Sequence, residues 1–173
     1  FFEDGDVRKL AMDAAGESIN EVYTEDIIDR AGGTTIYEEF MAFLAEPEAA
    51  GAIAAHAAFA YDWRHDVYDV VEKGTPYATT TRYLQDLFAA LADQASSGQV
   101  TIIGHSNGGL LGKALIDELA REGKAAQVDQ FIMIGTPQLG TPKAVASLLH
   151  GTGQGHDAFN GLLPVLRAET VRE

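Results

Sequence analysis

The chain contains no cysteine among its 173 residues. Disulfides, a thiol nucleophile and thiolate metal ligands are therefore excluded, while the compartment stays undecided. Basic residues are also few, since 12 Lys and Arg stand against 26 Asp and Glu and give a formal net charge of −14. This balance disfavours nucleic-acid binding and offers no basic face to anionic lipid, so we expect any transient contact with a lipid interface to be apolar.

The sequence also lacks long hydrophobic runs and an obvious leader. No apolar stretch reaches the roughly 18 residues that span a bilayer, and no basic-then-apolar segment opens the chain. We expect a soluble protein, either cytoplasmic or secreted. If the protein has a leader, we expect that leader to have been removed or to lie upstream of this sequence. No His-x-x-x-His spacing or carboxylate cluster indicates a metal, and no cofactor is expected.

The most informative stretch reads Gly-His-Ser-Asn-Gly-Gly at residues 104–109. It follows a β-branched run and precedes apolar residues at helical spacing, so Ser106 lies where a strand turns into a helix. This context is typical of a nucleophile elbow, in which the serine has strained backbone angles. We expect Gly104 and Gly108 to be required because side chains there would collide with the adjoining strand and helix.

The alternative is a glycine-rich turn with an inert serine, because such turns also occur in dinucleotide-binding folds. Those folds need a different glycine spacing and an acidic residue at the end of a later strand. Neither is evident in this sequence. The elbow is therefore the favoured interpretation.

Alternating periodicities predict an α/β fold with a doubly wound, mostly parallel sheet and helices on both faces. The predicted neighbouring parallel strands are residues 55–61, 99–105 and 128–135. The predicted helices are residues 35–46, 78–96 and 107–122. The first helix opens with a capping-box pattern of Thr35 and Glu38, and Pro47 is expected just past its end. We expect one domain over residues 1–173, incomplete at both ends.

Three segments in order carry a family resemblance: Tyr-Asp-Trp-Arg at 61–64, the elbow, and Gly-Thr-Pro-Gln-Leu-Gly-Thr-Pro at 135–142. Over residues 35–150 the chain resembles the α/β-hydrolase lipases of the lecithin:cholesterol acyltransferase-like family and its bacterial esterase relatives. The resemblance implies a hydrolase or acyltransferase of lipid metabolism that acts on lipid-like carboxylic esters through an acyl-enzyme on Ser106. Many relatives have histidine where this chain has Gln138, a change beside the site that leaves the nucleophile in place.

A serine nucleophile needs a histidine base, a carboxylate and N–H donors for the oxyanion. The backbone N–H of Asn107, the residue after the nucleophile, is the expected donor. Only His150 and His156 follow Ser106, and Asp129 stands at the amino end of its strand, away from the reactive edge. We therefore expect the triad acid and base to lie outside this chain, which alone would be inactive, and residues 150–173 to begin a lid or cap insertion.

Several assignments stay open at this level. Asp62 and Arg64 form either an ion pair that anchors a loop or, with Trp63, part of the acyl pocket. The alternative function is a catalytically inactive hydrolase-fold module that binds a hydrophobic ligand or partner. Amide substrates are a third reading, and the oligomeric state is undetermined.

Overall fold

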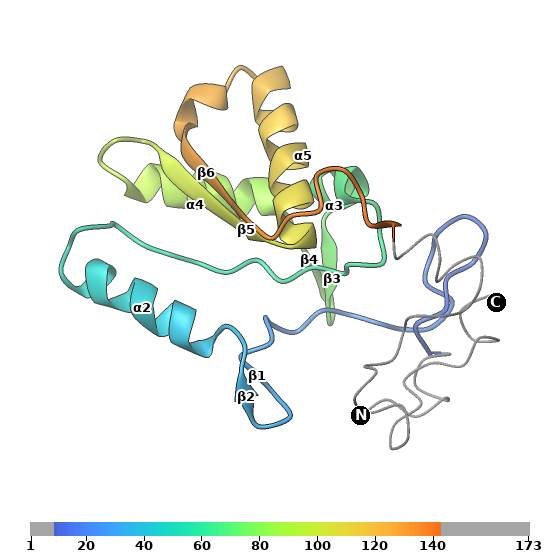
Figure 1. Ribbon diagram of the computed structural model, residues 1–173. Coiled ribbons are helices and arrows are strands. Elements are labelled where there is room, and N and C mark those ends of the chain that lie inside the picture. The colour runs from blue at the N-terminus through green and yellow to red at the C-terminus, as the bar shows by residue number, and fades with distance from the viewer. Residues whose placement is uncertain (1–8, 143–173) are drawn as a thin grey trace. The chain divides into compact units, whose positions relative to one another are not determined.

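The computed structural model describes residues 9–142 (Figure 1). These residues belong to two units. The larger unit consists of residues 23–136. Of the other unit, the structure describes residues 9–22, with an isolated antiparallel bridge between Met12 and Ser18, and residues 137–142. The predicted insertion at 150–173 lies outside the described residues. Among those that are described, no helix is long and apolar enough to cross a membrane.

A strand, a helix and a second strand form the centre of the larger unit. β5 (Val100–His105) leads through Ser106 into α5 (Asn107–Arg121), and β6 (Val128–Ile134) follows a short 3-10 turn. β5 and β6 pair in parallel, with Ile102 opposite Phe131 and His105 opposite Ile134. Two of the predicted strands and the predicted helix at 107–122 are thereby confirmed, and β-branched residues dominate β5 as that prediction required.

The core lies on one face of this parallel pair. α3 (Val67–Lys73), α4 (Leu84–Gln94) and α5 contribute its buried side chains, which are Val70, Val71, Phe88, Leu111, Ala114, Leu115 and Leu119. Val100 and Ile102 of β5 pack against this cluster, because alternate strand residues point to the same face. Burial of these side chains holds β5, the strand that leads into Ser106.

The opposite face of the pair is less covered. Ile103, Ile132 and Ile134 are 39%, 42% and 48% exposed. Within residues 9–142 the parallel sheet has two strands. A doubly wound sheet with helices on both faces is therefore not confirmed.

The predicted strand at 55–61 is wrong, because these residues form no strand in the structure. Side-chain hydroxyls hold the segment instead. The Tyr77 hydroxyl donates to the carbonyl of Ala60 at 2.8 Å, and the N–H of Asp62 donates to Thr75 Oγ1 at 2.9 Å. The segment is rich in alanine, which has low strand propensity, so the alternating pattern was not enough to produce a ladder.

An antiparallel hairpin supplies those hydroxyl groups. It consists of β3 (Thr75–Tyr77) and β4 (Thr80–Arg82), and it is absent from the elements predicted from the sequence. The helix predicted at 78–96 consequently begins only at Leu84, as α4. Ala78 turns the chain with a φ of 47°, a conformation for which alanine gives no sequence signal.

The helix predicted at 35–46 is present as α2 (Glu38–Ala49), but its predicted ends are wrong. Thr35 belongs to β2 (Thr34–Thr35), which pairs with β1 (Arg30–Ala31). Glu38 accepts from Arg30 Nη2 at 2.8 Å rather than completing a capping box. Pro47 lies inside the last turn of α2, not beyond it.

Candidate active site

Ser106 occupies the single-residue junction between β5 and α5. Its φ of 53° and ψ of −123° place it in a region that non-glycine residues rarely adopt. Its N–H donates to the carbonyl of Ile134 at 2.9 Å, and its own carbonyl accepts from the N–H of Gly109 at 3.1 Å. The residue is exposed. A strained, exposed serine at a strand-to-helix turn is the geometry of a nucleophile elbow.

The glycines of the elbow differ in how closely the backbone approaches them. A Cβ on Gly104 would lie 2.6 Å from the Cα of Gly109 and 2.7 Å from the carbonyl oxygen of Gly108, as expected for a residue that must lack a side chain. The same reasoning fails for Gly108, because a Cβ there would meet no atom within 4 Å. The second packing glycine is Gly109, which lies against the side chain of Thr136.

Tyrosine hydroxyls bond the residues on both sides of Ser106. Asn107 Nδ2 donates to the Tyr61 hydroxyl oxygen at 3.0 Å. The Tyr37 hydroxyl lies 2.6 Å from His105 Nδ1, and the two rings meet edge to face with centroids 5.7 Å apart. The sequence predicts no role at the elbow for either tyrosine, although Tyr61 begins the Tyr-Asp-Trp-Arg segment.

Asn107 is the first residue of α5. The first N–H groups of a helix have no intrahelical acceptor and carry the positive end of its dipole. The N–H of Asn107 therefore suits an oxyanion beside Ser106, as sequence analysis proposed. Burial raises the pKa of Tyr61, and the bond from Asn107 lowers it less, so its hydroxyl is neutral at physiological pH.

Asp62 and Arg64 form a buried two-pronged ion pair. Arg64 Nε donates to Asp62 Oδ1 at 2.9 Å and Nη2 donates to Oδ2 at 2.5 Å, with each side chain 5% exposed. Burial alone would raise the pKa of Asp62, but the bonds from Arg64 outweigh it and hold that pKa below its usual value. The pair thus anchors the loop after Tyr61, and a role in shaping an acyl pocket stays a prediction.

The roles expected for the remaining predicted site residues stay predictions. The Trp63 side chain is 67% exposed. Gln138 is exposed and belongs to the other unit. His150 and His156 lie outside the described residues.

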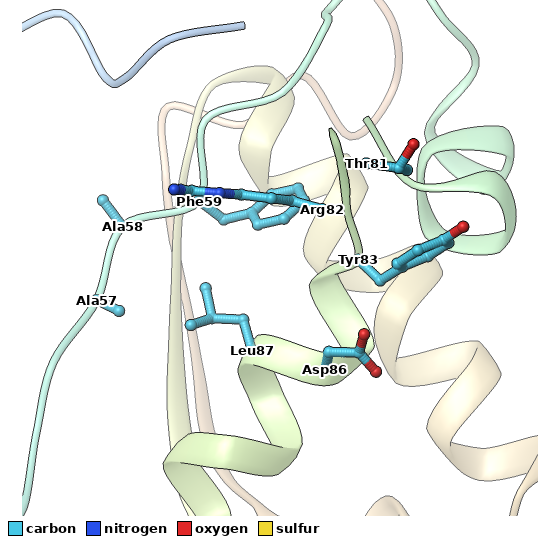
Figure 2. Close-up of a pocket in the computed structure, with 8 residues that line it drawn as sticks. All are labelled: Ala57, Ala58, Phe59, Thr81, Arg82, Tyr83, Asp86 and Leu87. Carbon is cyan, nitrogen blue, oxygen red and sulfur yellow. The ribbon is translucent and has the colours of Figure 1, made fainter. Parts of the chain in front are cut away.

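A surface pocket of about 470 Å³ lies between three segments of the larger unit. Figure 2 shows its lining side chains: Ala57, Ala58, Phe59, Thr81, Arg82, Tyr83, Asp86 and Leu87. The Arg82 guanidinium is 4.0 Å from the Tyr77 ring centroid, so its charge is engaged by that ring. None of the predicted site residues lines this pocket.

The chain matches one known family over most of its length. The sequence pattern described as lecithin:cholesterol acyltransferase matches residues 17–173. The chain belongs to the lecithin:cholesterol acyltransferase family. This family has an α/β-hydrolase fold, and its members are acyltransferases and esterases that act on lipids. No curated protein and no solved structure gives a match.

Proposed function

We propose that Ser106 is the nucleophile of a lipid-ester hydrolase or acyltransferase. The observation that carries this proposal is the positive φ of Ser106 at the junction of β5 and α5. Ser106 is exposed. Such backbone strain is concentrated at functional sites. Membership of a family of lipid acyltransferases and esterases supports lipid esters as the substrate class.

The proposed reaction has two acyl-transfer steps. Ser106 Oγ attacks the ester carbonyl carbon while its proton passes to a histidine base, and the Asn107 N–H binds the resulting oxyanion. Collapse expels the alcohol, which takes that proton, and leaves the acyl group on Oγ. Water or an acceptor alcohol then attacks this acyl group, its proton returns through the base to Oγ, and free or transferred product leaves.

We assign the base to a histidine outside residues 9–142. The three histidines within that range are engaged elsewhere: His56 pairs with Glu48, His65 lies 3.5 Å from Asp62, and His105 is bonded to Tyr37. His105 also directly precedes Ser106, and neighbouring side chains at such a turn point in different directions. These contacts support a base other than these three histidines, and the expectation that the triad acid and base lie outside the chain stays a prediction.

The test uses the full-length protein and p-nitrophenyl esters of several acyl lengths. Ser106→Ala is expected to lower kcat by about four to six orders of magnitude, as for other triad nucleophiles. The matched control is Ser96→Ala, an exposed serine in the loop after α4, which should keep full activity. A fluorophosphonate should label the protein stoichiometrically at Ser106.

Two results would contradict the proposal. Labelling that persists in Ser106→Ala would assign the nucleophile to another residue. Absence of both turnover and labelling in the wild-type protein, with retained binding of an apolar ester, would favour a catalytically inactive module that binds hydrophobic ligands.

A further inference from the structure

We infer that Tyr61 is a positioning residue for the proposed acyl transfer, because its hydroxyl holds the side chain of Asn107 next to Ser106. The inference rests on the proposed function of Ser106. Asn107 Nδ2 donates to the Tyr61 hydroxyl oxygen at 3.0 Å, and this bond joins residues 46 positions apart in the sequence. The group that Asn107 brings to the reaction is its backbone N–H, so the tyrosine acts through it rather than on the substrate.

Tyr61 is itself held in place on both sides. The carbonyl of its predecessor Ala60 accepts from the Tyr77 hydroxyl at 2.8 Å. The N–H of its successor Asp62 donates to Thr75 Oγ1 at 2.9 Å, and Thr75 is only 1% exposed. Both partners belong to β3, so this short strand fixes the tyrosine through two hydrogen bonds. The carboxylate of Asp62 is fixed in turn by Arg64.

These contacts help to keep Ser106 in its strained backbone conformation. A non-glycine residue with positive φ is less stable by about 1–3 kcal/mol and persists only where its surroundings fix it. The backbone of Ser106 has bonds to Ile134 and Gly109. The Asn107 side chain adds a third restraint, and it acts on the residue whose N–H would bind the oxyanion.

Tyr61 is better placed for this role than Tyr37. The bond between Tyr61 and Asn107 is partly buried, whereas that between Tyr37 and His105 is exposed to water. A hydrogen bond away from water has a lower local dielectric and holds its partners more firmly. Tyr37 also acts on His105, which contributes no group to the proposed reaction.

The experiment measures kcat and KM for Tyr61→Phe in the full-length protein. Loss of one neutral hydrogen bond of about 1.4 kcal/mol corresponds to about a tenfold fall in kcat, with KM little changed. Tyr68→Phe is the matched control, because the Tyr68 hydroxyl donates to Asp117 Oδ2 at 3.0 Å between α3 and α5. This control should keep the wild-type kcat.

A double-mutant cycle tests the route of the effect. Asn107→Ala keeps the backbone N–H but removes the side-chain amide that bonds Tyr61. It should therefore lower kcat about as much as Tyr61→Phe. The double variant should be no slower than the slower single variant. Fluorophosphonate titration of each variant counts folded, reactive Ser106, so that kcat is expressed per active site.

Each contrary outcome overturns the positioning role. An unchanged kcat per labelled site in Tyr61→Phe would leave the hydroxyl a structural role only, even if the melting temperature falls. A raised KM at constant kcat would place Tyr61 in contact with substrate. Multiplicative effects in the double variant would show that the bond is not the route. Labelling of Ser106 in the wild-type protein would uphold the proposed function in all three cases.

Discussion

The β5–α5–β6 segment and the segment 55–62 are ordered by different kinds of contact. The first is held by a parallel backbone ladder and by apolar packing of α5 on β5. The second has no ladder and is fixed by bonds from individual side chains, chiefly Thr75, Tyr77 and Arg64. The hydrogen bonds of a ladder join many backbone groups and do not depend on any one side chain. Side-chain substitutions should therefore affect the stability of the two regions in different ways.

The active-site proposal depends on both regions at once. Ser106 and Asn107 belong to the ladder-held unit, while Tyr61 belongs to the segment held by side chains. Steric fit should therefore limit substitutions in the first region. Hydrogen bonds and charge should limit those in the second.

The largest expected effect on the free energy of unfolding concerns the elbow glycines. Gly104→Ala should lower the free energy of unfolding by about 3 kcal/mol, because its Cβ meets backbone atoms that cannot move aside. Gly108→Ala is the control, since a Cβ there meets nothing within 4 Å. Alanine inside a helix is more favourable than glycine by up to about 1 kcal/mol, so this variant should be as stable as the wild type or more so. Urea unfolding measures both, and equal losses would refute the steric argument.

The next effect concerns the buried ion pair of the other region. Removing one partner of a buried pair destabilises by roughly 3–5 kcal/mol, and Asp62→Asn should lose about 2 kcal/mol because the amide keeps one acceptor for Arg64. Asp69→Asn is the control, since Asp69 and Lys73 form an exposed pair on α3. Exposed pairs contribute about 0–1 kcal/mol. Similar losses in both variants would show that burial of Asp62 is unimportant.

At acid pH the wild type and Asp62→Asn should have the same free energy of unfolding. Folding lowers the pKa of Asp62 below its usual 3.8, so the carboxylate adds stability that is complete above that value. This stability is lost as the pH falls through the lowered pKa of the folded state. Urea midpoints measured from pH 7 downwards should converge below pH 3.8, and a constant gap would contradict this linkage.

Features that depend on one short stretch of sequence were predictable, whereas contacts between distant residues were not. β5, α5 and β6 follow from local periodicity, and Ser106 and Asn107 follow from a motif in a recognisable context. The tyrosine bonds join residues 46 and 68 positions apart, so no local pattern reports them. The β3–β4 hairpin has three-residue strands and turns at an alanine, which leaves periodicity too little length to act on.

The smallest expected effect isolates the strain at Ser106. Glycine adopts positive φ freely, so Ser106→Gly should be more stable than Ser106→Ala by about 1 kcal/mol, although both lack the proposed nucleophile. Ser96 provides the matched comparison, because it is exposed and does not have a positive φ. There Ser96→Gly should be less stable than Ser96→Ala by about 0.5 kcal/mol, since glycine gains more freedom on unfolding. Thermal unfolding of the four variants gives both differences, and the same sign at both positions would show that the backbone at Ser106 stores no strain.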